Sequence, residues 1–541
     1  AILAQVLLFS ASLRPLAPVV FIFREAAPHF MARSISAAEL QQHTTKGDAW
    51  VAINGDVYDV SKFASMHPGG ELLLLEHAGT DASDQFWSYH AHEVLKKYQR
   101  LKIGHLEGAK AHPLPDPADI SVVPFGEPSF WMGWSSPYYN DTHKKFRSDV
   151  RRLLEEFRDE AESGESTGKA PSEELFARLG SEGFFACRIG KTAFPYVDKL
   201  PGGLDKETFD YFHEAIAHEE VAHLGTPGFL AGMGEGMVIG LPPVLQFGPD
   251  AMKAKVGAEV LRGQKRICLA ITEPNGGSDV ANLLTRAEKT PDGKFYKVNG
   301  TKKWITGGCE SQYFTTAVRT GGPGQNGVSM LLIERGPGVE TQYIPTSYSK
   351  AAGTAYVTFE NALVPVENLI GMENMGFLCI MYNFNHERWL IAQNLIGQGR
   401  AALADTFMWA RQRKIFGKSL IDQPVIRYKL ASSAATLESL QTFLEAVTYD
   451  MCKTKGGAVG ERLAGPIAML KYQTTRASWK IADDCVQILG GRGITRTGMG
   501  AKVEGFKNYV KYAAIYGGSE EILADLSVRQ AMRAFPPEAK L

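Results

Sequence analysis

The hydrophobic periodicity of this chain changes twice along its length, which limits the folds that it can adopt. Over residues 135–262 apolar side chains recur at three- and four-residue steps, as in FRSDVRRLLEEFRDEA, and predict amphipathic helices. Over residues 263–372 short runs such as SMLLIE and TAYVTFE, separated by glycine-rich turns, predict β-strands. Helical patterns return over residues 373–535. We therefore expect a β-domain between two helical domains.

The segment before these domains has its own organisation. Residues 36–108 form a small mixed unit, and residues 109–134, rich in proline and without periodicity, predict a linker. Residues 1–35 are apolar, but an arginine and two prolines interrupt the run. We interpret this segment as a processed or disordered leader, with Met31 as an alternative start, and we expect no stable membrane span.

The charge balance and the cysteines exclude several classes of function. Lys and Arg number 58 against 59 Asp and Glu, so the chain lacks the basic field that nucleic-acid binding needs. Its six cysteines lie far apart and form no CxxC pair, which argues against a zinc site or a disulfide framework and indicates a reducing compartment. The last residues, Ala539-Lys540-Leu541, are close to the S-K-L peroxisomal signal. We expect a peroxisomal location, with a mitochondrial one as the alternative.

Two histidine segments in the first unit predict a haem site. HPGG begins at His67, and FWSYH ends at His90, 23 residues later. Low-spin haem iron takes two axial imidazoles, and the glycines let the backbone turn tightly beside the porphyrin. Together with WVAINGDVYDVSKF and AGTDASDQF, these segments closely resemble cytochrome b5 over about 70 residues. The resemblance implies haem b with His67 and His90 as iron ligands, and His92 is the alternative to His90.

A glycine loop and an aromatic segment distinguish the β-domain. LAITEPNGGSDVAN combines an acid–proline corner with two glycines and a serine, so its amides and hydroxyl can approach a flavin and a pyrophosphate closely. KKWITGG places Trp304 and Thr306 on one face of a strand. Both segments resemble the acyl-CoA dehydrogenase family, and the resemblance extends over residues 135–535. The first motif departs from the family pattern only at Asn282, where a small residue is usual.

The resemblance implies a multidomain fold, a cofactor and the residues that hold it. After a small α+β cytochrome b5-like domain, the fold would comprise an N-terminal α-helical domain, a middle β-barrel-like domain and a C-terminal four-helix bundle. The cofactor would be FAD. Its expected contacts are Leu269, Ile271, Thr272, Gly277, Ser278, Trp304, Thr306, Arg413, Phe416, Gln423, Gln487, Gly490, Gly491, Ser519 and Glu521. Ser278 is also expected near the CoA pantetheine.

The resemblance further implies an oligomer that shares FAD between subunits. RQRKIFGKSLIDQPVI resembles the family segment that crosses a dimer interface, so Arg413 and Phe416 would reach the FAD of the neighbouring subunit, with Gln423 close by. We therefore expect a homodimer or a homotetramer.

Desaturation of an acyl thioester needs a carboxylate to remove the α-proton. Many family members carry it directly after the tyrosine of the C-terminal segment, where this chain has Gly517. A subset, including isovaleryl- and long-chain acyl-CoA dehydrogenases, carries it instead in a Glu-Arg pair on a neighbouring helix, and NFNHERWLIAQ supplies such a pair. This resemblance makes Glu387 the expected base and Arg388 a structural or substrate-positioning cation. Glu520 and Glu521 are the rival bases.

The implied reaction is α,β-dehydrogenation of an acyl-CoA. Glu387 would take the α-proton and FAD N5 the β-hydride, while the backbone N–H of Gly517 would hold the thioester carbonyl beside Gly518. The electron acceptor could be oxygen, an electron-transfer flavoprotein or the haem. One alternative function is a flavin oxidase or monooxygenase acting on a non-thioester such as a nitroalkane. Another is a haem electron-transfer or interaction module on a degenerate flavoprotein body.

Overall fold

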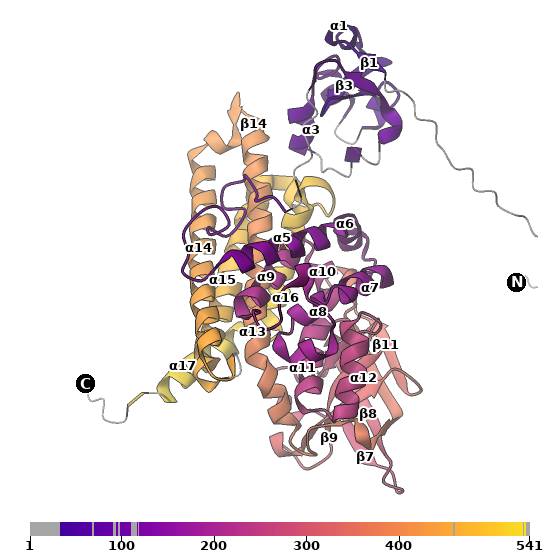
Figure 1. Ribbon diagram of the computed structural model, residues 1–541, viewed down its shortest axis with the longest axis vertical. Coiled ribbons are helices and arrows are strands. Elements are labelled where there is room, and N and C mark those ends of the chain that lie inside the picture. Colours follow the sequence, from indigo (N-terminus) through magenta and orange to yellow (C-terminus); the bar gives the residue numbers. More distant parts are fainter. Residues whose placement is uncertain are drawn as a thin grey trace, which may run out of the picture. The chain divides into compact units, whose positions relative to one another are not determined.

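The computed structural model describes residues 33–67, 70–89, 94–95, 98–109, 116, 118–457, 460–533 and 535–536. The side chains of residues 87–89 and 461 are not described. The chain divides into two compact units, the first within residues 1–113 and the second mainly from residue 114 onward. Figure 1 shows the elements of both. Residues 1–32 of the expected leader, the expected ligand His90 and the terminal tripeptide lie outside the described residues. The leader prediction was wrong at its end, because Ser34 and Ile35 form a strand of the first unit.

The first unit is built on a small sheet. Within the described residues the strand order is β1-β5-β4-β3-β2. Asn54 and Gly55 both adopt positive φ and form the turn of the central β-hairpin, as an Asn-Gly pair favours. The strands are β1 (Ser34–Ile35), β2 (Thr44–Thr45), β3 (Asp48–Ile53), β4 (Asp56–Asp59) and β5 (Lys102–Leu106), and the helices include α1 (Ala37–Leu40), α2 (Glu71–Leu75) and α3 (Ser83–Tyr89).

Short and medium helices begin the second unit, as the periodicity predicts. They are α5 (Asp141–Glu155), α6 (Arg158–Thr167), α7 (Glu173–Ser181), α8 (Phe184–Cys187), α9 (Tyr211–His223), α10 (Pro227–Leu230), α11 (Gly236–Phe247) and α12 (Asp250–Leu261). A π-turn, Ala231–Glu235, joins α10 to α11. The stretch Pro227–Phe247 is apolar and long enough to cross a membrane, but 89% of it is buried inside the folded unit, as in a core helix.

The second half of the segment expected as a linker packs against these helices. The carboxylate of Glu127 is buried and accepts hydrogen bonds from Arg147 at 3.0 Å and from Arg151 at 2.6 Å. Trp131 is buried too, and its indole N–H donates to Glu219 at 2.7 Å. Residues 118–134 therefore form part of the second unit, held by a buried ion-pair network that the proline-rich composition does not indicate.

The β-domain follows as a mainly antiparallel sheet. Within the described residues its order is β11-β12-β8-β7-β9-β10-β13, with β6 paired in parallel to β9. Its own apolar core includes Phe314, Leu331 and Phe359. The strands are β6 (Ile267–Ala270), β7 (Arg286–Lys289), β8 (Phe295–Ile305), β9 (Tyr313–Arg319), β10 (Val328–Glu334), β11 (Val339–Tyr343), β12 (Ala355–Pro365) and β13 (Leu369–Ile370).

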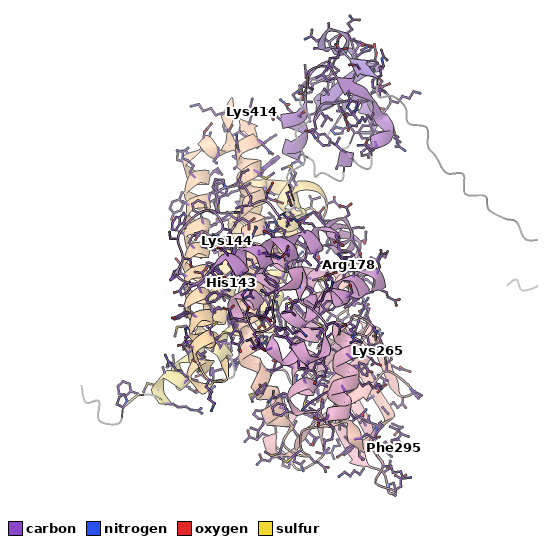
Figure 2. All side chains as sticks on the ribbon, in the orientation of Figure 1. His143, Lys144, Arg178, Lys265, Phe295 and Lys414 are labelled. Carbon is purple, nitrogen blue, oxygen red and sulfur yellow. The ribbon has the colours of Figure 1, made fainter. Side chains whose placement is uncertain are left out.

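Long helices form the C-terminal bundle. They are α13 (Gly376–Gln412), α14 (Pro424–Lys453), α15 (Ala464–Leu489), α16 (Ala501–Ile515) and α17 (Glu520–Arg533). α13 packs against α9, α11, α14, α15 and α16, so it is buried over most of its length. The short hairpin β14 (Lys414–Ile415) and β15 (Lys418–Ser419) joins α13 to α14, and Figure 2 labels Lys414 at this end of the bundle.

Candidate active site

The carboxylate of Glu387 lies buried within the helical bundle. α13 carries it, and only 5% of the residue is exposed. Oε1 faces Gly517, since a Cβ at that glycine would stand 3.4 Å from it. Oε2 has no hydrogen-bond partner within the described part of the chain. Burial raises the pKa of Glu387 to about 7, although Arg388, Lys471 and His386 favour the charged form. Such a carboxyl can accept a proton near neutral pH.

Two cations hold the loop that faces this carboxylate. Gly517 and Gly518 have φ of +66° and +100° and connect α16 to α17. Arg388 donates from Nε to the carbonyl of Gly517 at 3.1 Å, and Lys471 donates from Nζ to the carbonyl of Gly518 at 2.8 Å. A Cβ at position 517 would come within 2.5 Å of Ile391 Cδ1. The loop thus needs glycine on both conformational and steric grounds.

Lys471 is a residue of this site that sequence reasoning missed. It lies on α15 and is fully buried. Burial lowers the pKa of its ammonium group to about 7, while Glu387 acts in the opposite direction. The only signal in the sequence is a lysine within the apolar run AGPIAMLKYQ, a pattern that by itself does not tell a buried amine from one that reaches solvent.

The two rival carboxylates are held elsewhere. Glu520 is buried and accepts a hydrogen bond from Arg476 at 3.4 Å. Glu521 is exposed on the first turn of α17. Hydrogen bonds from its own backbone N–H and from the Ser519 hydroxyl hold the pKa of Glu521 below its usual range. Neither carboxylate is among the three heavy atoms nearest to a Cβ at Gly517.

An ion pair braces the glycine loop that follows β6. Glu273 accepts hydrogen bonds from Lys302 Nζ at 2.8 Å and from the backbone N–H of Thr285 at 2.9 Å. Both charged groups are buried. This arrangement fixes the two ends of the loop and leaves Gly277 and Ser278 exposed. The acid of the acid–proline corner is therefore structural, and the exposed glycine and serine are the groups available to a ligand.

The other expected contacts on this segment lie directly before the loop. Leu269 is half-buried at the end of β6, Ile271 is buried, and Thr272 is half-buried. All three come from one continuous stretch of backbone. They therefore lie next to the exposed glycine and serine along the chain, although Ile271 itself is buried.

The segment with Trp304 and Thr306 meets the C-terminal bundle through Thr306. Trp304 is 48% exposed and holds a φ of +65°, which is strained for an aromatic residue and is typical of functional sites. The Thr306 hydroxyl is hydrogen-bonded to the Tyr512 hydroxyl. The Tyr512 ring lies 4.7 Å from that of Tyr516, the residue that precedes Gly517. The expected flavin contacts and the Glu387 loop thus adjoin one another.

Six further expected FAD contacts gather at the hairpin end of the bundle, and the other two, Ser519 and Glu521, lie at the start of α17. Phe416 is 95% exposed at the tip of the hairpin, with a φ of +48°. Arg413 and Arg492 lie over the Trp409 ring at 6.0 Å and 4.8 Å, which brings the hairpin and the turn after α15 together. The expected contacts here are Arg413, Phe416, Gln423 at the start of α14, exposed Gln487 on α15, and Gly490 and Gly491 with open space where a Cβ would stand.

The Glu387 loop with the adjoining FAD contacts and the FAD contacts at the hairpin end are far apart within one chain. Arg413 follows Glu387 by 26 residues, nearly all of them in α13. At about 1.5 Å per residue that separation is roughly 39 Å. If both groups contact FAD, the neighbouring subunit has to supply one of them.

Comparison with known proteins decides the family. Residues 140–264, 268–362 and 374–532 match the N-terminal, middle and C-terminal domains of acyl-CoA dehydrogenases. Acyl-CoA dehydrogenase apdG of Emericella nidulans is 39% identical over 431 residues, which cover 78% of this chain and 98% of that protein. The chain belongs to the acyl-CoA dehydrogenase family. Residues 36–107 of this family member also match the cytochrome b5-like haem/steroid-binding domain.

Other relatives and solved structures agree with this assignment. Acyl-CoA dehydrogenase AFT10-1 of Alternaria alternata is 38% identical over 76% of this acyl-CoA dehydrogenase and 96% of its own length. The structure of a putative acyl-CoA dehydrogenase from Mycobacterium smegmatis superposes with a TM-score of 0.65, at 28% identity over 73% of this chain and 99% of that one. Butyryl-CoA dehydrogenase from Megasphaera elsdenii, at 24% identity and a TM-score of 0.65, shares the fold. The predicted fold class and enzyme class are confirmed.

The FAD expected from the family fits the residues of this acyl-CoA dehydrogenase. The acyl-CoA dehydrogenase fold binds FAD, so the cofactor prediction is confirmed. Around Gly277, Gly490 and Gly491 no neighbouring atom would crowd an added Cβ, which leaves space for a ligand at both groups of contacts. Trp304 presents an exposed aromatic surface beside the first of them.

The first unit fits a haem. The Nδ1 of His67 lies 3.1 Å from the Gly70 carbonyl oxygen, which assigns the proton to Nδ1 and the lone pair that can bind iron to Nε2. α2 contains four consecutive leucines, yet none of its residues is buried. An exposed apolar helix is typical of a binding surface, and a porphyrin is apolar over most of its own surface. The cytochrome b5-like domain supports haem as the second cofactor.

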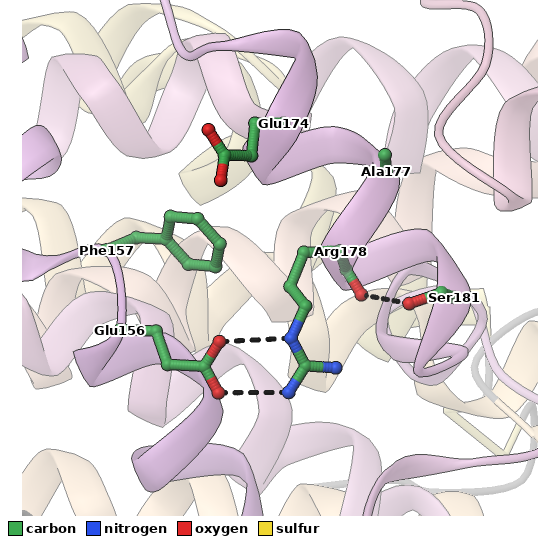
Figure 3. A pocket seen from close by; sticks show the side chains of 6 residues that line it. All are labelled: Glu156, Phe157, Glu174, Ala177, Arg178 and Ser181. Atoms are coloured by element: carbon green, nitrogen blue, oxygen red, sulfur yellow. Dashed lines mark hydrogen bonds and ion pairs between the residues drawn. The ribbon is translucent and has the colours of Figure 1, made fainter. Parts of the chain in front are cut away.

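Two other features in the described residues are accounted for without a ligand. His143, Asp210 and His213 have the composition of a metal site, but Asp210 and Asn140 cap α9 and α5, and the two histidines complete these capping boxes. The surface pocket in Figure 3 is lined by Glu156, Phe157, Glu174, Ala177, Arg178 and Ser181. There Arg178 donates two hydrogen bonds of 3.0 Å to Glu156, so the charged groups satisfy each other.

Proposed function

We propose that this protein introduces a double bond between the α- and β-carbons of an acyl-CoA thioester, with Glu387 as the base. The observation that supports this role best is the placement of the carboxylate. It is buried, its Oε2 has no partner within the described residues, and it faces the Gly517 loop. Of the three heavy atoms nearest to a Cβ at that glycine, two belong to the Glu387 carboxylate.

Residues of the chain would remove the α-proton, stabilise the thioester oxygen and hold the Gly517 loop. Glu387 takes the α-proton, and burial keeps its basicity high enough for this step. The backbone N–H of Gly517 donates to the thioester oxygen and stabilises the negative charge that develops there. Arg388 and Lys471 hold the carbonyls of the loop, so the N–H groups keep their direction. The chemistry that FAD supplies when bound is acceptance of the hydride from the β-carbon.

We infer that the active site is completed by a second subunit. The exposed hairpin with Arg413 and Phe416 lies about 39 Å along α13 from Glu387, so one FAD would meet the hairpin of a partner chain. Ser278 is exposed on the glycine loop, and we propose that it contacts the CoA part of the substrate. Ser519 and Glu521, at the start of α17, would complete the FAD contacts.

The experiment is a comparison of two matched variants of the FAD-loaded protein. Glu387→Gln should retain FAD but lose turnover by about 10⁴-fold or more, because an amide accepts no proton. Glu520→Gln changes a buried carboxylate that faces Arg476 and should retain activity within a few-fold. Anaerobic flavin bleaching by straight, branched and aromatic acyl-CoA thioesters is the measurement. Equal activity of the Glu387 variant and the wild type would contradict the proposal, as would bleaching by nitroalkanes alone.

A further inference from the structure

Arg188 is a buried cation whose guanidinium group has no hydrogen-bond partner in the part of the chain that the structure describes. It follows α8 and is fully buried. None of its three guanidinium nitrogens has a hydrogen-bond partner within the described residues. Burying a guanidinium without hydrogen-bond partners is strongly unfavourable, because its N–H groups lose their hydration and gain nothing in return. Folded proteins rarely retain such a group unless a ligand or water satisfies it.

Glu235 lies close to this guanidinium and is also incompletely satisfied. It ends the π-turn between α10 and α11 and is buried. Its Oε1 accepts a hydrogen bond from the Tyr509 hydroxyl at 3.1 Å, while Oε2 has no partner within the described residues. Arg188 and Glu235 do not form an ion pair with each other. Burial raises the pKa of Glu235 to about 7, and Arg188 opposes that shift.

The turn is shaped to admit the guanidinium. A Cβ at Gly234 would overlap Nη1 of Arg188, so any larger residue there would displace the arginine. π-turns of this kind interrupt a helix at functional sites more often than elsewhere. The lack of a side chain at Gly234 thus leaves room for the Arg188 guanidinium beside the turn between the apolar helices α10 and α11.

The same buried network reaches the proposed base. The Tyr509 hydroxyl lies 3.0 Å from that of Tyr516, and Tyr516 directly precedes Gly517. The negative charge of Glu387 contributes to the raised pKa of Glu235, so the two carboxylates share one region of low polarity. Hydrogen bonds through Tyr509 and Tyr516 thus link Glu235 to the residue before Gly517, and Arg188 interacts electrostatically with Glu235 at the other end of this network.

We propose that Arg188 binds an acceptor oxygen carried by the acyl group beyond its β-carbon, a carboxylate or a carbonyl, so the substrate is an oxygenated acyl-CoA. This assignment rests on the proposed function and narrows its substrate class. A plain hydrocarbon chain would leave the guanidinium without a partner. An oxygen of the acyl group would accept hydrogen bonds from the guanidinium N–H groups of Arg188. A carboxylate would do so in the bidentate geometry that arginine favours. Glu235 in its protonated form would donate a further hydrogen bond to the same oxygen.

The test compares thioesters that differ only at the end of the acyl chain. Anaerobic bleaching of the FAD-loaded protein is measured with glutaryl-, adipoyl- and suberoyl-CoA against pentanoyl-, hexanoyl- and octanoyl-CoA, and with oxo-acyl-CoA thioesters of the same lengths. At one length or more the oxygenated thioester should react about 10- to 100-fold faster in kcat/KM, the range expected for a hydrogen bond to a charged group. The Glu387→Gln variant should bind these thioesters without turnover, and the shift of its flavin spectrum reports their affinity. The oxygenated thioesters should again bind more tightly than the apolar ones.

Arg188→Met should remove this preference and leave the apolar thioesters within a few-fold of the wild type. Arg188→Lys should keep part of the preference, and FAD content with thermal melting shows whether each variant folds. If the methionine variant does not fold, Gly234→Ala, which crowds the guanidinium, should reduce the preference in its place. Apolar thioesters that react as well as oxygenated ones at every length would overturn the assignment alone. No bleaching by any thioester would overturn the proposed function and this assignment with it.

Discussion

Glu387 and Gly517, 130 residues apart in the sequence, face each other so closely that a Cβ on the glycine would stand 3.4 Å from Oε1 of the glutamate. The carboxylate thus occupies the region that a side chain at position 517 would enter. This relationship explains why a glycine follows Tyr516 in a chain that carries a Glu-Arg pair on α13. The consequences can be measured.

Gly517→Ala should destabilise the loop and reduce turnover sharply. The residue holds a φ of +66°, and its Cβ would lie 2.5 Å from Ile391 Cδ1. Left-handed backbone costs about 1–3 kcal/mol for a non-glycine residue, and the clash adds to it. Thermal melting and kcat/KM are the measurements. Gly498→Ala, at a φ of +69° with open space around its Cβ, is the matched control for backbone strain alone and should retain activity.

The pH dependence of kcat/KM should reflect the raised pKa of Glu387. The base acts only when deprotonated, so kcat/KM should rise with pH through about 7. Stability changes in the opposite direction. Because the folded pKa exceeds the unfolded one, the proton bound by Glu387 stabilises the fold below about pH 4.5, and this contribution disappears as pH rises through about 7.

Lys471 should affect the pH at which kcat/KM reaches half of its maximum. Its positive charge favours the ionised carboxylate, so Lys471→Met should move the kcat/KM profile to higher pH and also weaken the hold on Gly518. Lys480→Met on the same helix removes a lysine paired with Asp484 and should leave the midpoint unchanged. A midpoint that moves equally in both variants would contradict a specific effect of Lys471.

Complementation between subunits should reveal whether FAD is shared. A Glu387→Gln chain and an Arg413→Ala chain are each expected to be inactive alone. If the base and the hairpin of one site come from different subunits, the mixed dimer contains one intact site out of two and should show about half of wild-type activity. Coexpressed, differently tagged chains purified by both tags provide the measurement. Complete inactivity of the mixed dimer would mean that both groups act within one chain.

Haem binding should depend on His67 and be independent of FAD. His67→Ala removes the proposed iron ligand, so the Soret band should be lost or strongly displaced while the flavin absorbance remains. His77→Ala in the same unit is the control and should keep the Soret band. Anaerobic reduction with an acyl-CoA then tests electron transfer, because a haem that stays ferric after the flavin bleaches receives no electrons from it.

The sequence alone determined the order of domains, since hydrophobic periodicity depends on local geometry that each segment retains in the fold. The resemblance to family members with a Glu-Arg pair, together with Gly517 at the usual position of the base, also predicted Glu387 as the base. His90, outside the described residues, and the roles of the FAD contacts remain predictions. Periodicity shows which face of a helix is apolar but not which neighbour covers it.

Tertiary structure decided what lies around the carboxylate. Lys471 on α15 reaches the loop after α16, and Arg188 and Glu235 from different helices come close to Tyr509. These groups are separated by tens to hundreds of residues, and only the packing of the helices brings them together. Burial explains how these groups behave. Removal from water raises the pKa of a carboxylate without a partner, and it makes a ligand that hydrogen-bonds to a guanidinium without partners favourable. Neither burial nor the lack of a partner is visible in the order of residues.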